Sequence, residues 1–146
     1  MIKKIDHINI VVSNLEKSTA FFVDLLGFQV NNKGHLAGEW IDRVVGLNSV
    51  DADYVQLILP EAQTRLELIK YHHPESDRSK NIAKSNQIGF RHMALEVTDI
   101  EQVYHNLQQA GVKILSELQS YNGSKKLCYF LGPDNIILEL AEYGSF

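Results

Sequence analysis

The sequence predicts an α+β protein built from two copies of one β-α-β-β-β module, because the chain contains an internal repeat. Residues 6–16 read like residues 91–101, and a second echo closes each half, where residues 66–71 read like residues 138–143. A chain of 146 residues is long enough for one domain with a substantial core and too short for two independent ones. We therefore expect both modules to form a single domain.

The domain spans residues 1–146, with the first module at residues 1–72 and the second at residues 88–146. Residues 73–87 are charged and polar and are predicted to link the modules. The adjacent His72 and His73 are interpreted as solvated residues of this linker region.

The first module opens with a strand at residues 5–12, where polar and apolar side chains alternate. Ser13 and Glu16 then have the spacing of a capping box, which predicts a helix that Gly27 ends. The strand-like runs that follow are residues 28–31, 54–59 and 65–71.

The second module repeats this order. Thr98 and Glu101 have the same capping-box spacing, and Gly111 is expected to end the helix. The strand-like runs after it are residues 112–115, 127–131 and 136–143, with a turn at 132–135. One asymmetry is an insertion at residues 38–47, which is predicted to be helical, whereas the second module has a shorter loop at residues 120–124.

The composition is that of an ordinary globular protein, with 45% hydrophobic and 22% charged residues. A formal net charge of -4 argues against nucleic-acid or anionic-membrane partners, and no apolar run has the length of a membrane span. The single Cys128 cannot form an internal disulfide, so no oxidising compartment is required. With no signal segment expected, the sequence predicts a cytoplasmic protein.

Two histidines and two glutamates occupy equivalent points of the repeat: His7 matches His92, and Glu67 matches Glu139. Each residue alone is explained by a solvated strand face or a structural histidine. All four at matching points favour a divalent metal site, because sheets that curl toward each other would bring these side chains together. Two nitrogens and two carboxylates without thiolate suit Zn, Ni, Co, Fe or Mn with open positions for substrate, which implies catalysis.

Several motifs resemble the vicinal oxygen chelate superfamily, which includes glyoxalase I, bleomycin-resistance proteins and extradiol dioxygenases. They are Asp6-His7-Ile8, Leu25-Leu26-Gly27-Phe28, Gly89-Phe90-Arg91-His92 and the segment at residues 132–140. The resemblance implies two βαβββ modules that form a cupped mixed sheet around one divalent metal ion. It also implies a homodimer that acts on a small molecule with vicinal oxygens.

The ligand set His7, Glu67, His92 and Glu139 resembles that of glyoxalase I most closely. This resemblance implies a metal-dependent isomerase or lyase (lactoylglutathione lyase type), in which the metal stabilises an enediolate and a glutamate moves the proton. Both Glu67 and Glu139 are candidates for that base.

Three alternatives stay open. A methylmalonyl-CoA-epimerase-like enzyme resembles the chain, but usually has Gln in place of Glu67, and Glu39 in the insertion would supply another base. An Fe(II) extradiol-type dioxygenase needs only one Glu, so the fourth ligand argues against it. A non-catalytic small-molecule-binding protein does not need the four ligands.

Further residues are expected to line the pocket. Asn9 and Ala94 lie two positions beyond the histidines, on the same strand faces. Tyr129 is either a hydrogen-bond donor to a metal-bound oxygen or a core aromatic residue. Trp40 either covers the pocket as a lid or simply packs it, and packing is favoured. Arg65 shares the face of Glu67 and is expected to form a surface salt bridge.

Overall fold

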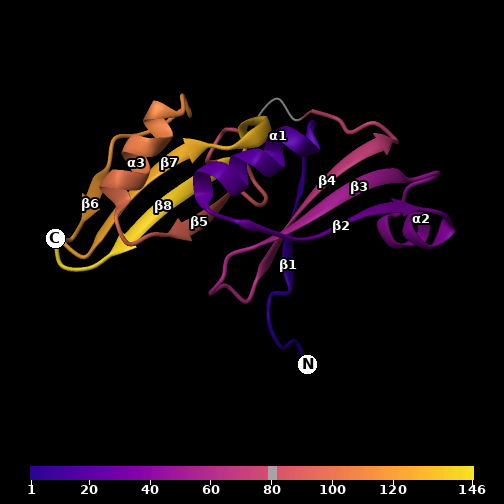
Figure 1. The fold of residues 1–146 in the computed structure, drawn as a ribbon, viewed down its shortest axis with the longest axis horizontal. Coiled ribbons are helices and arrows are strands. Elements are labelled where there is room, and N and C mark those ends of the chain that lie inside the picture. The colour runs from indigo at the N-terminus through magenta and orange to yellow at the C-terminus, as the bar shows by residue number, and fades with distance from the viewer. Residues whose placement is uncertain (79–81) are drawn as a thin grey trace. The chain divides into compact units, whose positions relative to one another are not determined.

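A computed structural model describes residues 1–78 and 82–146 and divides the chain into two compact units, Met1–Arg78 and Ser79–Phe146 (Figure 1). Each unit contains one four-stranded mixed sheet and the helix that follows its first strand. The α+β prediction with two βαβββ modules is therefore confirmed. No helix in the described part of the chain is long and apolar enough to cross a membrane.

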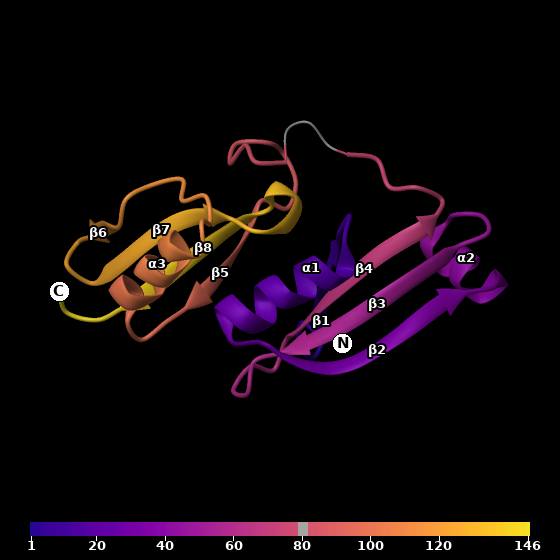
Figure 2. The same cartoon turned by 45° about the horizontal axis from the view of Figure 1, so that its top comes forward.

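Unit 1 has the strand order β1-β4-β3-β2, with β1 parallel to β4 and the other pairs antiparallel. Its elements are β1 (His7–Val11), α1 (Leu15–Ala20), a π-helical turn (Phe21–Leu25), β2 (Gln29–Ala37), α2 (Glu39–Val45), β3 (Asp51–Ile58) and β4 (Arg65–His73). Helix α1 packs on β3 and β4 (Figure 2). Leu66 and Leu68 are buried on this helix side, so Glu67 between them lies on the opposite face, as the alternation predicts.

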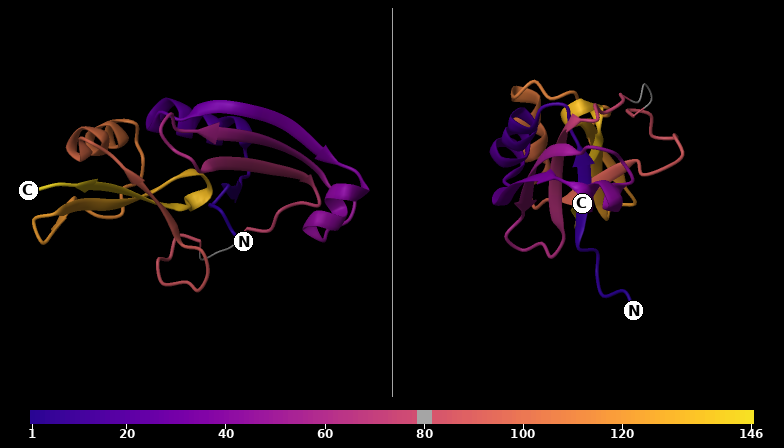
Figure 3. Two further views of the ribbon diagram at one scale, coloured as in Figure 1. Left: turned by 90° about the horizontal axis from the view of Figure 1, so that it is seen from below. Right: turned by 90° about the vertical axis from the view of Figure 1, so that its right-hand side faces the viewer.

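Unit 2 has the equivalent order β5-β8-β7-β6, and β5 is parallel to β8 (Figure 3). Its elements are β5 (His92–Glu96), α3 (Ile100–Gln109), β6 (Gln119–Tyr121), β7 (Lys125–Leu131), a 3-10 turn (Pro133–Asn135) and β8 (Ile137–Tyr143). Helix α3 packs on β8, and Glu142 on that strand accepts a hydrogen bond from the backbone N–H of Ile100 at 3.3 Å. Each sheet therefore buries the equivalent face under the equivalent helix of its own unit.

In each unit, large aliphatic and aromatic side chains fill the space between the sheet and its helix. The largest fully buried side chains there include Phe22, Leu57 and Leu68 in unit 1, and Ile100, Leu107, Phe130, Leu138 and Leu140 in unit 2.

Both helices start one residue later than the capping-box pattern predicts. Asn14, and not Ser13, is the N-cap of α1, and its side chain accepts a backbone hydrogen bond at 2.9 Å. Asp99, and not Thr98, caps α3 in the same way at 3.0 Å. Asn and Asp side chains cap helix N-termini at least as well as Ser and Thr hydroxyls do. A Ser-Asn or Thr-Asp pair therefore does not show which of its two residues is the N-cap.

Two strand predictions were wrong in extent. The predicted run at residues 28–31 continues as β2 to Ala37, through an Asn-Asn-Lys-Gly stretch that resembles a turn. The predicted strand at residues 112–115 makes only an isolated bridge, and the edge strand β6 instead lies in the segment predicted as a loop. Both errors concern edge strands. One side of an edge strand's backbone needs no partner strand, so the residue composition is a weak guide to where the strand begins and ends.

The predicted helical insertion is confirmed as α2, which packs through Ile41 against Val50, Ala52 and Ile69. Ala52 and Ile69 lie on the same sheet face as Glu67, because their cross-strand partners alternate with those of the buried leucines. Helix α2 therefore covers part of the face that carries Glu67.

Asp42 joins α2 to the start of β3, and its replacement by Ala is expected to destabilise unit 1. Its Oδ1 accepts a hydrogen bond from the Val50 N–H at 2.8 Å, and its Oδ2 accepts one from the Ser49 N–H at 2.9 Å. Losing both should lower the free energy of unfolding by about 1–2 kcal/mol, measured by urea denaturation. The control is Arg43→Ala, which removes only an exposed ion pair with Glu39 and should cost well under about 1 kcal/mol. Equal effects of the two substitutions would contradict this role of Asp42.

Candidate functional site

In unit 1, His7, Asn9 and Glu67 share the sheet face opposite α1, because Asn9 pairs with Glu67 across parallel strands and His7 lies two residues earlier. The Asn9 side-chain amide donates to Glu67 Oε1 at 3.2 Å. Glu67 is half-buried, and the described residues offer it no charged side-chain partner. The structure thus brings three of the predicted site residues of this module to one face.

His7 and Arg65 both contact Asp6. His7 Nδ1 lies 3.0 Å from Asp6 Oδ2, and Arg65 donates to the same oxygen. The hydrogen bond from His7, followed by that from Arg65, holds the pKa of Asp6 below its usual value. Arg65 therefore forms the surface salt bridge that the sequence predicts, and Asp6 leaves the Nε2 atom of His7 available for a ligand.

In unit 2, His92 and Glu139 form a close pair on the face opposite α3. His92 Nε2 lies 3.1 Å from Glu139 Oε2, and Ala94 is the cross-strand partner of Glu139. Glu139 is 4% exposed, so a carboxylate is buried among apolar strands. Burial of this kind is rare without a compensating charge.

Lys125 on β7 supplies that charge, with its Nζ 2.8 Å from Glu139 Oε1. The hydrogen bond to Glu139 raises the pKa of Lys125, so the lysine is charged at neutral pH. The sequence interpretation missed Lys125, although a signal was present: Lys125 lies four residues before Tyr129 on one strand and so on the same face.

Tyr129 is also on this face, because it is the cross-strand partner of Glu139. Its ring contacts the His92 ring, with the centroids 4.9 Å apart. Tyr129 is half-buried and not a fully buried core aromatic, and its position in a pocket stays a prediction.

The separation in the unit 2 pair is that of an ion pair, and it is also one that two ligands of a single metal ion can have. Bonds of about 2.0–2.2 Å from one ion to an imidazole nitrogen and a carboxylate oxygen put these atoms roughly 3 Å apart, and the observed separation is 3.1 Å. Within residues 1–78 and 82–146, no group of three or more His, Cys, Asp or Glu side chains is arranged to hold a metal ion. Each unit by itself therefore contributes a pair of candidate ligands.

The insertion residues do not reach this chemistry within unit 1. Trp40 is 56% exposed, so the favoured prediction that it packs was wrong, and Ile41 makes the packing contact instead. Glu39, the additional base of the epimerase alternative, is exposed and bonds Arg43 at 3.2 Å. A seven-residue helix buries only a narrow stripe of side chains, and in α2 the buried position is Ile41, the residue after Trp40.

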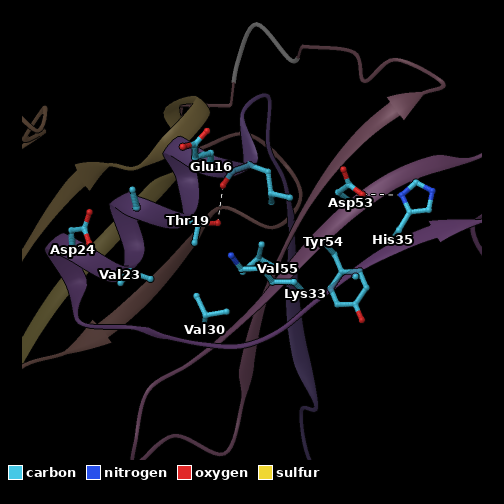
Figure 4. A pocket seen from close by; sticks show the side chains of 13 residues that line it. Glu16, Thr19, Val23, Asp24, Val30, Lys33, His35, Asp53, Tyr54 and Val55 are labelled. Atoms are coloured by element: carbon cyan, nitrogen blue, oxygen red, sulfur yellow. Dashed lines mark hydrogen bonds and ion pairs between the residues drawn. The ribbon is translucent and has the colours of Figure 1, made fainter.

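A groove of about 760 Å³ lies on the helix side of unit 1, away from Glu67 (Figure 4). It runs between α1 and strands β2 and β3, with Val23, Val30 and Val55 along it and the His35–Asp53 pair at one end. The groove exists because α1 packs on β3 and β4 and leaves the helix side of β2 uncovered.

Asp53 contacts two histidines, His35 on β2 and His72 on β4. His35 Nδ1 lies 2.8 Å from Asp53 Oδ1, and His72 Nε2 lies 2.8 Å from Asp53 Oδ2. The interpretation of His72 and His73 as solvated is confirmed, because both are exposed. They end β4 and are not part of a linker, and His73 Nδ1 lies 2.8 Å from the Ser49 carbonyl oxygen. Hydrogen bonding to the histidines, His35 first, lowers the pKa of Asp53.

The His35–Asp53 contact should make stability depend on pH. The hydrogen bond to Asp53 raises the pKa of His35 above its usual value of 6.5, so its contribution is fully present below that value and is lost as pH rises through the raised pKa. We expect His35→Gln to lower the free energy of unfolding more at pH 5.5 than at pH 8.5, measured by urea denaturation. His105→Gln, on the exposed face of α3, is the control and should show no such difference. An equal loss at both pH values would contradict this coupling.

Cys128 is 1% exposed, and burial raises the pKa of its thiol to about 11. Cys128 is therefore a small core residue and not a reactive thiol.

Comparisons with known proteins cover nearly the whole chain. Residues 4–140 match the family model described as the Glyoxalase/Bleomycin resistance protein/Dioxygenase superfamily. The crystal structure of a glyoxalase family protein from Bacillus cereus aligns with a TM-score of 0.91 and 28% identity, over 98% of this chain and 95% of that one.

Two relatives with named activities are epimerases. The mitochondrial methylmalonyl-CoA epimerase of Dictyostelium discoideum is 26% identical over 97% of this chain and 79% of its own length. The 2-epi-5-epi-valiolone epimerase of an Actinomyces species is 23% identical over 93% of this chain and 77% of its own length.

Proposed function

Because this chain belongs to the Glyoxalase/Bleomycin resistance protein/Dioxygenase superfamily, we propose that it is a divalent-metal-dependent enzyme that moves a proton between neighbouring carbons of a small substrate. The reaction would be an isomerase or lyase reaction of glyoxalase I type. The observation that carries the proposal is the His92–Glu139 pair, in which a buried carboxylate lies 3.1 Å from a partly exposed imidazole nitrogen, a separation that two ligands of one metal ion can have.

His92 and Glu139 would hold the metal together with His7 and Glu67, whether the two pairs come from one chain or from two. The donor set of two imidazoles and two carboxylates fits Zn, Ni, Co, Mn or Fe. When bound, the metal would act as a Lewis acid that stabilises the negative charge formed on the substrate oxygens after proton removal.

We assign the general base to Glu67. Glu139 has both oxygens engaged, one with Lys125 and one with His92. Glu67 has one oxygen bonded by the neutral amide of Asn9. A carboxylate that must take up and return a proton works best with an oxygen that no cation holds, and Asn9 would keep Glu67 oriented toward the substrate.

The substrate would be a small molecule with adjacent oxygens, one of them a carbonyl. Asn9 and Tyr129 supply neutral polar groups beside the two pairs, and they suit hydroxyl and carbonyl oxygens. Ala94 leaves room next to Glu139.

An epimerase is the second candidate, and the similarity to the two named epimerases favours it. Proton removal and return at one carbon next to a carbonyl would use the same ligands. Against it stands Glu39, which is exposed and paired with Arg43. The dioxygenase and non-catalytic binding alternatives have no comparable support from the side-chain arrangement.

A metal analysis combined with proton exchange tests the proposal. Protein purified without chelators should contain about one equivalent of a divalent metal. In D2O it should introduce deuterium next to the carbonyl of an accepted substrate, detected by NMR. The panel should include hemithioacetals of 2-oxoaldehydes, a CoA thioester of a 2-methyl-branched acid, and cyclitol ketones. Failure to bind any divalent metal after reconstitution would contradict the proposal.

We further propose a homodimer, by resemblance to the family, and a cytoplasmic location, which the single cysteine supports.

A further inference from the structure

Lys125 lies where a cation has a direct effect on the proposed metal site. It extends from the first position of β7, and its side chain is 24% exposed. Its Nζ bonds Glu139 Oε1 at 2.8 Å and lies 5.4 Å from the centre of the Tyr143 ring. Three features therefore hold the ammonium in place: a buried carboxylate, an aromatic ring and partial burial.

The two oxygens of Glu139 have different neighbours. Oε1 faces Lys125, whereas Oε2 faces His92 Nε2 at 3.1 Å. The contact with the Tyr129 ring limits the movement of His92 on the other side. Lys125 thus fixes the rotation of the carboxylate and leaves one oxygen directed at the histidine.

We propose that Lys125 is a positioning residue that acts as the internal counter-ion of Glu139, orienting its carboxylate while weakening the binding of a divalent metal there. This inference rests on the proposed function, because it assumes that Glu139 is a metal ligand. A metal on Oε2 and the ammonium on Oε1 would share one carboxylate, and their repulsion is strong where little water screens it.

A purely structural salt bridge between Lys125 and Glu139 predicts the opposite change in metal affinity when Lys125 is removed. If Lys125 only kept Glu139 ordered, its loss would free the carboxylate and weaken metal binding. A counter-ion has the reverse effect, since removing it deletes a positive charge beside the metal. The sign of the change in metal affinity therefore distinguishes the two roles.

Zinc titration by calorimetry tests this with Lys125→Met and Lys125→Gln, which remove the charge, and with Lys125→Arg, which keeps it. We expect the Met and Gln variants to bind Zn²⁺ at least about tenfold more tightly than the wild type, and the Arg variant to remain within about threefold. Zinc binding that persists in Glu139→Gln belongs to other sites and is subtracted.

Lys126→Met is the matched control, because Lys126 is the next residue, faces α3 and pairs with Glu101. Its zinc affinity should equal that of the wild type. Circular dichroism and melting of the chelator-treated variants establish that they are folded. Neutral variants that are folded and bind zinc as the wild type does, or more weakly, would overturn the counter-ion role alone. A wild type that binds no zinc at the Glu139 site would overturn the proposed function and this inference together.

Discussion

The Glu139→Gln variant is expected to lose metal binding and turnover together. The substitution keeps the shape of the side chain but removes the charge that both His92 and Lys125 face, at a residue that is only 4% exposed. A neutral amide is a weaker ligand, and it leaves the Lys125 ammonium without its counter-charge. We expect metal affinity to fall on the order of 100-fold or more, and turnover to fall by a factor of about 10² to 10⁴.

Metal content by elemental analysis and zinc affinity by calorimetry measure the first effect, and deuterium exchange measures the second. Glu142→Gln is a suitable control, because Glu142 is on the same strand but its carboxylate accepts a hydrogen bond from the N-terminus of α3. That variant should keep its metal, since an amide oxygen can still accept the bond. Full metal content in Glu139→Gln would remove Glu139 from the ligand set.

Much of the fold follows from the repeat in the sequence. Capping residues, a helical stripe and strand alternation occur twice, and local signals that agree with each other specify a structure more firmly than any one of them. The side of each strand was predictable because the period of two fixes it: Leu66 and Leu68 are buried, and Glu67 is therefore on the other face.

The edges and the polar clusters were less predictable. Strand β6 and the second half of β2 pair on one side only, so their residues carry little apolar signal. The contacts of Asp53 with His35 and His72 depend on the register of three strands, which no local pattern specifies. A register shift between Asp51 and Ala52 changes which side chains become neighbours there.

The candidate site shows the same division. Alternation and the repeat placed His92, Ala94 and Glu139 on one face, and the structure brings His92 and Glu139 into contact. Lys125 was missed because a lysine at a strand end is usually solvated, and only the buried carboxylate opposite makes it part of a site. The strand period gives the face of Lys125, but its pairing with Glu139 also depends on the register of β7 and β8.

The Glu67→Gln variant should separate proton transfer from metal binding. Gln keeps an oxygen that can bind a metal. That oxygen can also still accept the hydrogen bond from the Asn9 amide, which in the wild type lies 3.2 Å from Glu67 Oε1. It cannot take up a proton. We expect the variant to fill with metal when enough is supplied, while deuterium exchange falls by a factor of about 10² or more. Glu16→Gln is the control, because Glu16 is exposed on α1, at the other side of the sheet, and its replacement should leave exchange unchanged.

The result also distinguishes the two candidate reactions. An enzyme of glyoxalase type with Glu67 as base loses exchange in Glu67→Gln at full metal occupancy. An epimerase that takes its proton through another group keeps exchange. Retained exchange in Glu67→Gln together with loss in Glu39→Gln would move the base to α2, and it would require Glu39 to leave Arg43, which it bonds at 3.2 Å. Since that bond is exposed and weak, the movement would cost little, and kinetics of the two variants side by side would decide between the reactions.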